Sequence, residues 1–440
     1  MLSRHSQVSN SDYRHGLIPG GAHTYSRGDD TFPENAPAVL VRGKGSIVTS
    51  LSGSRYVDWA MSLRSVVLGH SHPAIKRAVK RAARTGNNLA RPVPEEFLLA
   101  EELRSLIPSA EMVKFGKNGS DATDAAVRLA RAATGRPKVL RSSADAFLGV
   151  HDWFIGSTVM NRGVPDAVVN MTESFQFGSI EALETALLNN RGQVAAVVME
   201  PAGSEIPTKE YLQSVRSLAS EHGVVLVFDE TVSGFRVSKS GAQGYFGVTP
   251  DLSTFGKAMG NGYPLSALTG RRDLMELGGI RHPEERVFLM SSTYGAERTG
   301  LLAGLATIGV LSRKPVIQRI WEVGSQIQSN IEMIVNELQL NEFIRIGGLP
   351  CSPNLSFARS DGTADLVLKT IFMEQLISRG HFVSSNLFSP AYSHSNSQVT
   401  SLVRAAHGAL TTVQKAANAS EPSDFLLGRP ILPVFRKKNA

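Results

Sequence analysis

The stretch Val224-Val225-Leu226-Val227-Phe228-Asp229-Glu230 is the most informative about the fold, because five apolar residues run directly into two carboxylates. A short apolar run of this kind is typical of a strand that is buried on both faces. In open α/β sheets, ligands bind outside the carboxyl ends of the strands, so Asp229 lies where a site is expected. Taken alone, a carboxylate at such a place more often caps the turn that follows.

The second informative stretch is Pro250-Asp251-Leu252-Ser253-Thr254-Phe255-Gly256-Lys257-Ala258-Met259-Gly260-Asn261-Gly262-Tyr263-Pro264. Its three glycines around Lys257 permit tight backbone paths and let a bulky ligand approach the main chain. A lone lysine is usually solvated, whereas a crowded, glycine-walled turn can desolvate the amine and make it a nucleophile toward an aldehyde. A strand-end acid followed by such a lysine matches what pyridoxal 5'-phosphate (PLP) requires, namely an anion at the ring nitrogen and an amine for the aldehyde.

The phosphate of such a cofactor needs its own binding site, and Gly119 and Ser120 supply one at the start of a helix expected over Ser120–Thr134. Free N–H groups and the helix dipole favour an anion at this position. An ordinary serine N-cap is the alternative interpretation. The surrounding sequence is neither a Walker A loop nor a dinucleotide-binding glycine fingerprint.

The middle of the chain alternates short β-rich runs with longer amphipathic stretches, which predicts a parallel-rich sheet covered by helices. Expected elements include strands over Val194–Met199 and Val224–Phe228 and a long helix over Val316–Leu338. We predict an α/β protein of three segments: an N-terminal segment (1–60) that packs with the small domain, a large PLP-binding domain (61–310) and a C-terminal small α+β domain (311–440).

Composition excludes several classes of function. With 42% hydrophobic and 19% charged residues among 440, the chain can bury a large core. No run approaches the roughly 18 apolar residues of a membrane helix, so we expect no membrane partner and a cytoplasmic location. The densest basic run, Lys76 to Arg81, lies on a predicted helix with apolar Ile75, Val79 and Ala82 on one face. No recognised nucleic-acid motif accompanies it, so no nucleic-acid partner is expected.

Five motifs in order resemble class III aminotransferases: Gly-His-Ser-His-Pro (69–73), Asn-Gly-Ser-Asp-Ala (118–122), Met-Glu-Pro-Ala (199–202), Phe-Asp-Glu-Thr-Val-Ser-Gly-Phe-Arg (228–236) and Phe-Gly-Lys-Ala-Met-Gly-Asn-Gly (255–262). Within that family, Pro19-Gly20-Gly21 through Arg27 and Gly43-Lys44-Gly45 resemble glutamate-1-semialdehyde 2,1-aminomutase and its aminotransferase relatives. The resemblance implies the PLP-dependent transferase fold of type I, whose large domain holds a mostly parallel seven-stranded sheet beside a smaller α+β domain.

The resemblance assigns a role to each matched residue. It implies that Lys257 carries PLP as a Schiff base and later moves the substrate proton, and that Asp229 holds the ring nitrogen protonated. Gly119 and Ser120 would bind the phosphate. Thr293, in Ser291-Ser292-Thr293-Tyr294-Gly295, matches a threonine that such enzymes lend to the phosphate of the neighbouring subunit. A homodimer with shared active sites is therefore implied.

The remaining matches either leave a second interpretation open or depart from the family's usual residues. Glu200 and Glu230 match family carboxylates near the cofactor, although a structural role suits each equally. Family members usually carry Tyr-His-Gly where this chain has Phe147-Leu148-Gly149, so stacking on the cofactor ring survives at Phe147 while the tyrosine hydroxyl and the neighbouring imidazole are lost. Arg27 aligns with an arginine near the mutase's carboxylate pocket, or is a surface arginine paired with the acids that follow it.

The histidines at 70 and 72 alternate before Pro73, as in the helix-entry turn of the family, so no metal is expected. Three hypotheses for function remain: an aminotransferase that uses a small-molecule amino donor and a carbonyl acceptor, an aminomutase that moves the amino group within one substrate, and a non-catalytic PLP-binding protein. Intact Lys257 and Asp229 disfavour the third. The choice between the first two depends on loops that control whether an intermediate escapes.

Overall fold

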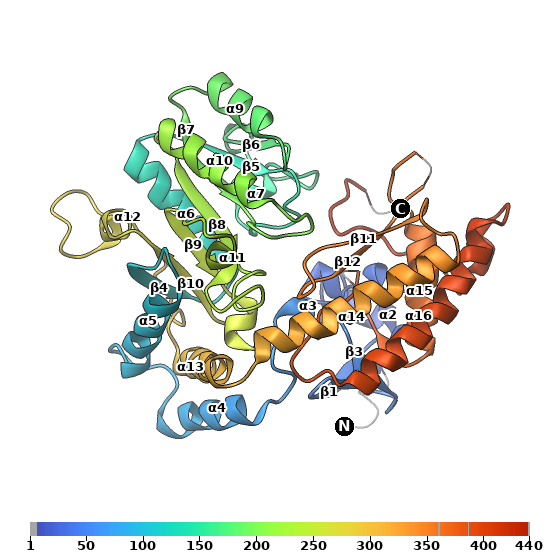
Figure 1. The fold of residues 1–440 in the computed structure, drawn as a ribbon. Coiled ribbons are helices and arrows are strands. Elements are labelled where there is room, and N and C mark those ends of the chain that lie inside the picture. Colours follow the sequence, from blue (N-terminus) through green and yellow to red (C-terminus); the bar gives the residue numbers. More distant parts are fainter. Residues whose placement is uncertain (1–6, 360, 386, 439–440) are drawn as a thin grey trace. The chain divides into compact units, whose positions relative to one another are not determined.

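The computed structural model describes residues 7–359, 361–385 and 387–438 (Figure 1). The chain divides into two compact units. The large unit is Pro73–Ile317, and the small unit joins the residues up to His72 with Gln318–Arg436. The first boundary coincides with the start of a helix at Pro73, and the second lies just inside a helix that begins at Val316, whereas the sequence-based divisions lie after residues 60 and 310.

The large unit is built on seven strands in the order β4-β10-β9-β8-β7-β5-β6. β10 runs antiparallel to its neighbours β4 and β9, whereas the pairs among β9, β8, β7, β5 and β6 are parallel. The predicted mostly parallel seven-stranded sheet is therefore confirmed. The strands are β4 (Met112–Gly116), β5 (Lys138–Ser142), β6 (Thr172–Phe175), β7 (Val194–Met199), β8 (Val225–Glu230), β9 (Leu252–Phe255) and β10 (Ser266–Gly270).

Every residue of β7 and β8 is buried, as expected for central strands covered on both faces. Helix α6 packs against β9 and β10, and α10 packs against β8. The helices of this unit are α4 (Pro73–Thr85), α5 (Pro94–Leu106), α6 (Gly119–Thr134), α7 (Asp152–Ile155), α8 (Asp166–Val169), α9 (Ile180–Asn189), α10 (Lys209–Glu221), α11 (Gly241–Phe246), α12 (Arg272–Met275) and α13 (Arg298–Arg313), with 3-10 turns η3 (Lys257–Gly260) and η4 (Glu276–Gly278).

Two helices of the large unit agree with the sequence patterns. Helix α6 covers the predicted Ser120–Thr134 and ends at Gly135, which adopts a left-handed conformation (φ +66°) and donates its N–H to the Arg131 carbonyl. Helix α4 carries the basic run, and its own residues Ile75 and Ala82 are buried. The charges therefore follow the solvated face, as predicted.

In the small unit, residues from both ends of the chain share one sheet, in the order β1-β2-β3-β13. β13 pairs in parallel with β3, so that His381 lies opposite Val57. Trp59 is fully buried in a hydrophobic core that also includes residues of the helices Val316–Glu337, Leu366–Ser378 and Asn396–Ala417. The elements are α2 (Ser11–Leu17), η1 (Tyr25–Arg27), η2 (Asp29–Thr31), β1 (Leu40–Lys44), β2 (Ile47–Ser50), β3 (Arg55–Asp58), α3 (Met61–Arg64), α14 (Val316–Glu337), β11 (Ile344–Gly347), β12 (Asn354–Phe357), α15 (Leu366–Ser378), β13 (His381–Phe382), α16 (Asn396–Ala417) and η5 (Pro422–Phe425).

Helix α14 begins at Val316, as predicted, and ends one residue before the predicted Leu338. In the part of the chain that the structure describes, no single helix is long and apolar enough to cross a membrane. Helices α13 and α14 are separated by a sharp bend, and only when taken together are they long and apolar enough to pass this test of length and composition.

Candidate active site

Asp229 lies at the carboxyl end of β8 and is only 4% exposed. Its Oδ1 accepts hydrogen bonds from the Thr231 backbone N–H (2.9 Å) and from the Thr254 hydroxyl (2.8 Å). Thr254 lies directly opposite Asp229 on the neighbouring strand β9. Burial raises the pKa of Asp229, while these hydrogen bonds and the charge of Lys257 act against that rise. The carboxylate does cap the next turn, and it is also fixed by a second strand.

Lys257 leaves the sheet at the same edge, because it follows β9 by one residue beyond Gly256. Its backbone has φ +41°, a left-handed conformation that residues other than glycine seldom adopt. Such strain costs about 1 to 3 kcal/mol and is often found at functional sites. The side chain is half-buried, and its charge contributes to the electrostatic environment of Asp229. The two principal predicted residues thus come from adjacent strands.

Helix α6 begins at Gly119, next to this pair. Asp121 Oδ2 accepts the backbone N–H groups of Lys117 (3.1 Å) and Asn118 (3.0 Å). Among the described residues, the N–H groups of Gly119 and Ser120 have no acceptor, as suits a helix start that binds an anion. A Cβ on Gly119 would lie 2.8 Å from the side chain of Thr231, so only glycine lets the helix start this close to the turn after Asp229.

The loop after β5 carries the departure from the usual Tyr-His-Gly. Phe147 is 45% exposed and contacts Phe154 edge to face, with ring centroids 5.8 Å apart. Leu148 is buried, and its carbonyl accepts the Thr123 hydroxyl (2.7 Å). The position of the missing imidazole is therefore a packed core position in this chain. An exposed ring at Phe147 remains able to stack on a ligand.

The two family-matched glutamates differ. Glu230 is fully buried and accepts hydrogen bonds from Ser233 Oγ (2.8 Å), Ala242 N (2.5 Å) and the backbone and side-chain N–H groups of Gln243 (2.9 and 3.1 Å). These bonds secure the start of α11, and a Cβ on Gly241 would lie 2.5 Å from the same carboxylate. Glu200 follows β7 and is half-buried; its backbone N–H donates to Asp145 Oδ1 (3.3 Å).

Asp145 is a residue that the sequence reading missed. It lies in the turn after β5, is 6% exposed, and its pKa is well above the usual value because burial and the negative charges of Glu200 and Asp229 disfavour ionisation. No motif marked it, since a single aspartate in a turn is common. Its position beside Glu200 became visible only when β5 and β7 were paired.

Thr293 is exposed in the segment before α13, and its carbonyl accepts Asn88 Nδ2 (3.1 Å). Its side chain makes no hydrogen bond to Gly119 or Ser120 within the described part of the same chain.

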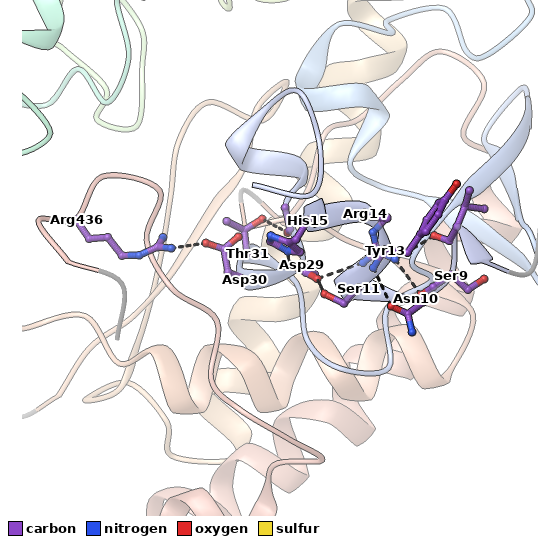
Figure 2. Close-up of polar contacts among 12 residues, drawn as sticks. Ser9, Asn10, Ser11, Tyr13, Arg14, His15, Asp29, Asp30, Thr31 and Arg436 are labelled. Carbon is purple, nitrogen blue, oxygen red and sulfur yellow. Dashed lines mark hydrogen bonds and ion pairs between the residues drawn. The ribbon is translucent and has the colours of Figure 1, made fainter. Parts of the chain in front are cut away.

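Arg27 belongs to the small unit, where Nη2 donates to Ser62 Oγ (3.2 Å). The acids that follow it have other partners, as Figure 2 shows. Asp29 accepts from Ser11, Arg14 (3.2 Å) and His15 (3.0 Å), and Asp30 pairs with Arg436 (2.5 Å). Arg27 therefore does not form the surface pair that the sequence left open.

Within the small unit, Arg27 lines a cavity of about 920 Å³ together with Arg42 and Arg429. Part of the wall is α3, in which all four residues of Met61–Arg64 have positive φ. A run of left-handed residues other than glycine costs energy at every position, and such strain persists only where the surrounding structure enforces it. His70, on the same wall, is engaged by Asp58 at 2.7 Å.

Comparison with known proteins identifies the family. Residues 30–374 match the model of class III aminotransferases. The chain belongs to the class III aminotransferase family. It is 32% identical over 423 residues to glutamate-1-semialdehyde 2,1-aminomutase of Roseiflexus castenholzii, covering 91% of this chain and 96% of that one. It is 31% identical over 407 residues to 3-aminobutyryl-CoA aminotransferase of Cloacimonas acidaminovorans, covering 91% and 95%.

The fold agrees with the family. The FumI protein of Sphingopyxis sp. MTA144, solved in its PLP internal aldimine form, superposes with a TM-score of 0.85 at 22% identity over 97% of this chain and all of that one. As a class III aminotransferase of fold type I, this protein is a PLP-dependent enzyme that transfers amino groups. The residues present fit the cofactor: a buried acid, a strained lysine and a helix start with free N–H groups meet at one edge of the sheet.

Proposed function

We propose that this enzyme is an aminotransferase similar to glutamate-1-semialdehyde aminomutase, in which Lys257 and Asp229 are the catalytic residues. The observation that carries the proposal is that both residues lie at the same edge of the sheet. They leave adjacent parallel strands at one edge, and Gly119 at the start of α6 lies so close to the turn after Asp229 that a Cβ on it would be 2.8 Å from the Thr231 side chain. Carboxyl ends of parallel strands are where α/β proteins bind their ligands.

Each residue has a task that follows from its place. Bound PLP supplies an aldehyde and an electron-accepting ring. The Lys257 amine would hold the aldehyde and would carry the proton to and from the substrate carbon. Asp229, fixed by Thr231 and Thr254, keeps the ring nitrogen protonated through its negative charge. The N–H groups of Gly119 and Ser120 would bind the phosphate, Phe147 would stack on the ring, and Glu200 would border the site.

The substrates are a small-molecule amino donor and a carbonyl acceptor. Arg27 is the proposed carboxylate-binding residue, supported by its place in a cavity that three further arginines, Arg14, Arg42 and Arg429, also line. A guanidinium grips a carboxylate through two parallel hydrogen bonds. The alternative is a true aminomutase, which the 32% identical relative favours. Release of a free keto product from an amino donor would identify an aminotransferase, whereas conversion within one substrate without release would identify a mutase.

The lysine assignment is tested by borohydride reduction of the purified yellow protein, followed by peptide mapping. We expect the label on Lys257 alone, and no label in Lys257→Ala. Lys239→Ala, which changes an exposed lysine of the same unit, should label normally. A label on any other lysine would overturn the assignment.

We also propose a homodimer in which Thr293 of each subunit reaches the phosphate bound by the other. Its exposure supports this, as do the exposed apolar side chains of Ile280, Phe288 and Tyr294 in the same segment. Thr293→Ala should weaken cofactor retention by about 1.5 to 3 kcal/mol. A fully active monomer at low concentration would exclude a shared site. The cytoplasmic location stays a prediction that cell fractionation can check.

A further inference from the structure

Asp145 is a buried acid for which the mechanism above has no use. Its Oδ1 accepts the backbone N–H of Glu200, the first residue after β7. Its Oδ2 is buried and has no hydrogen-bond partner among the described residues. A buried polar atom without a partner is rare in proteins and often indicates a bound group or a functional role.

The charges around Asp145 are mostly negative. Glu200 and Asp229 face it from the ends of β7 and β8. Arg141 of β5 is the cation nearby, but its guanidinium donates to Ser157 Oγ (2.7 Å) and to the carbonyls of Ser142 (3.0 Å) and Ser157 (3.2 Å). Tyr211 of α10 also faces Asp145, and burial raises the pKa of its phenol, so the phenol stays neutral and adds no charge.

An ionised Asp145 would therefore be a buried anion beside two others, with no ion pair among the described residues to compensate it. The protonated form removes that cost and makes Oδ2 a hydrogen-bond donor. It also leaves Asp229 as the anion that the cofactor ring nitrogen requires.

We propose that Asp145 is a positioning residue of the cofactor site that works as an uncharged acid: Oδ1 fixes the end of β7 at Glu200, and Oδ2–H donates a hydrogen bond inside the site. The acceptor would be an oxygen of the bound cofactor. This inference rests on the proposed site, because it assumes that the cofactor lies against Asp229.

Asparagine and alanine at position 145 separate this role from a purely structural one. Asn keeps an oxygen for the Glu200 N–H and presents N–H donors in place of Oδ2–H, but it cannot ionise. Ala removes both groups. Asp152→Asn, which removes an exposed acid from the start of α7, seven residues further along the chain, is the matched control.

The test is equilibrium binding of pyridoxamine 5'-phosphate to cofactor-stripped enzyme from pH 6 to 10, followed by absorbance. This ligand forms no Schiff base, so the titration of Lys257 does not enter as a covalent step. Wild type and Asp152→Asn should lose affinity toward high pH by about tenfold more than Asp145→Asn, as Asp145 ionises. Asp145→Ala should bind about tenfold more weakly than wild type at pH 7.

Superimposable pH profiles for wild type and Asp145→Asn would overturn the proposal, as would Asp145→Asn binding as weakly as Asp145→Ala at pH 7. Borohydride labelling of the same proteins with PLP distinguishes this failure from failure of the site itself. If Lys257 is labelled and the profiles coincide, only the role of Asp145 is wrong. If Lys257 is not labelled in wild type, the proposed site is wrong.

Discussion

The carboxyl edge of the large sheet and the N-terminal segment of the small unit hold their functional candidates in different ways. At the sheet edge, Asp229 and Lys257 are placed by strands that are buried along their whole length. In the N-terminal segment, Arg27 sits on a three-residue turn between α2 and η2, and ion pairs and hydrogen bonds of Asp29 and Asp30 secure the neighbouring residues (Figure 2).

Residues that act on reacting atoms need a more rigid setting than residues that recognise a substrate. Buried strands fix a side chain to within a narrow range, which suits residues that act on reacting atoms. A segment secured by partly exposed polar contacts is easier to remodel, because each such contact contributes little. Substrate recognition can therefore diverge among relatives while the sheet edge stays the same.

Asp229→Asn should produce the largest effect. The amide keeps an oxygen for the Thr231 and Thr254 donors, so the fold should persist, but it lacks the charge that holds the ring nitrogen protonated. We expect the turnover number to fall roughly a thousandfold. Steady-state kinetics with an accepted donor, on protein shown to be folded by circular dichroism, checks this. Near-normal turnover would show that ring protonation does not depend on Asp229.

Glu230→Gln is the complementary change one residue along the same strand. Both carboxylate oxygens accept N–H or O–H groups, so an amide nitrogen would face a donor. We expect a loss of about 1 to 3 kcal/mol in the free energy of unfolding, with little change in turnover of the folded enzyme. Urea unfolding of both variants gives the comparison. If Glu230→Gln slows turnover as much as Asp229→Asn does, the separation of the two roles is wrong.

These neighbours also show what the sequence could and could not reveal. The apolar run before Asp229 predicted a buried strand with an acid at its end, and the glycines around Lys257 predicted a crowded turn. Nothing in the adjacent letters separated Glu230 from Asp229, because opposite faces of a strand become distinct only when the surrounding elements are placed. The partner Thr254 likewise required the register of β8 with β9.

Polar contacts over long range were the hardest to predict. The acids after Arg27 offered it a local pair, but Asp29 is bound by Arg14 and His15 and Asp30 by Arg436, some four hundred residues away in sequence. Asp145 gave no signal, since its importance comes from the ends of two other strands. Residues defined by strand periodicity were predictable, and those defined by a meeting of separate segments were not.

Arg27→Ala should change substrate preference without changing the fold. If its guanidinium binds the carboxylate of the donor, the Michaelis constant for glutamate should rise about tenfold or more, and that for an amine without a carboxylate should be nearly unchanged. Arg55→Ala, an exposed arginine of the same unit, should affect neither donor. Equal effects on both donors, or none on either, would show that Arg27 is not the carboxylate-binding residue.

The smallest expected effect is a loss of stability of the N-terminal segment at low pH, as Asp29 becomes protonated. Burial acts to raise the pKa of this carboxyl, but hydrogen bonds from Ser11 and His15 and the charge of Arg14 outweigh it and lower the pKa from 3.8 to about 2. Because the folded pKa is depressed, the stabilisation is complete above about pH 4 and is lost as the pH falls through 2. The contact is partly exposed, so its contribution should be below about 1 kcal/mol.

Pepsin, which cleaves in this pH range, offers a direct measurement. Cleavage within residues 10–31, normalised to an unstructured peptide and to cleavage of the large unit, should rise as wild type is taken from pH 4 to pH 2. Asp29→Asn lacks the stabilisation at pH 4 already, so its cleavage should start high and change little. Asp12→Asn, which alters an exposed acid on α2, should follow wild type. If Asp29→Asn and wild type superimpose across this range, Asp29 does not order the segment that carries Arg27, and the contrast with the sheet edge would have to rest on Arg436 and Asp30 instead.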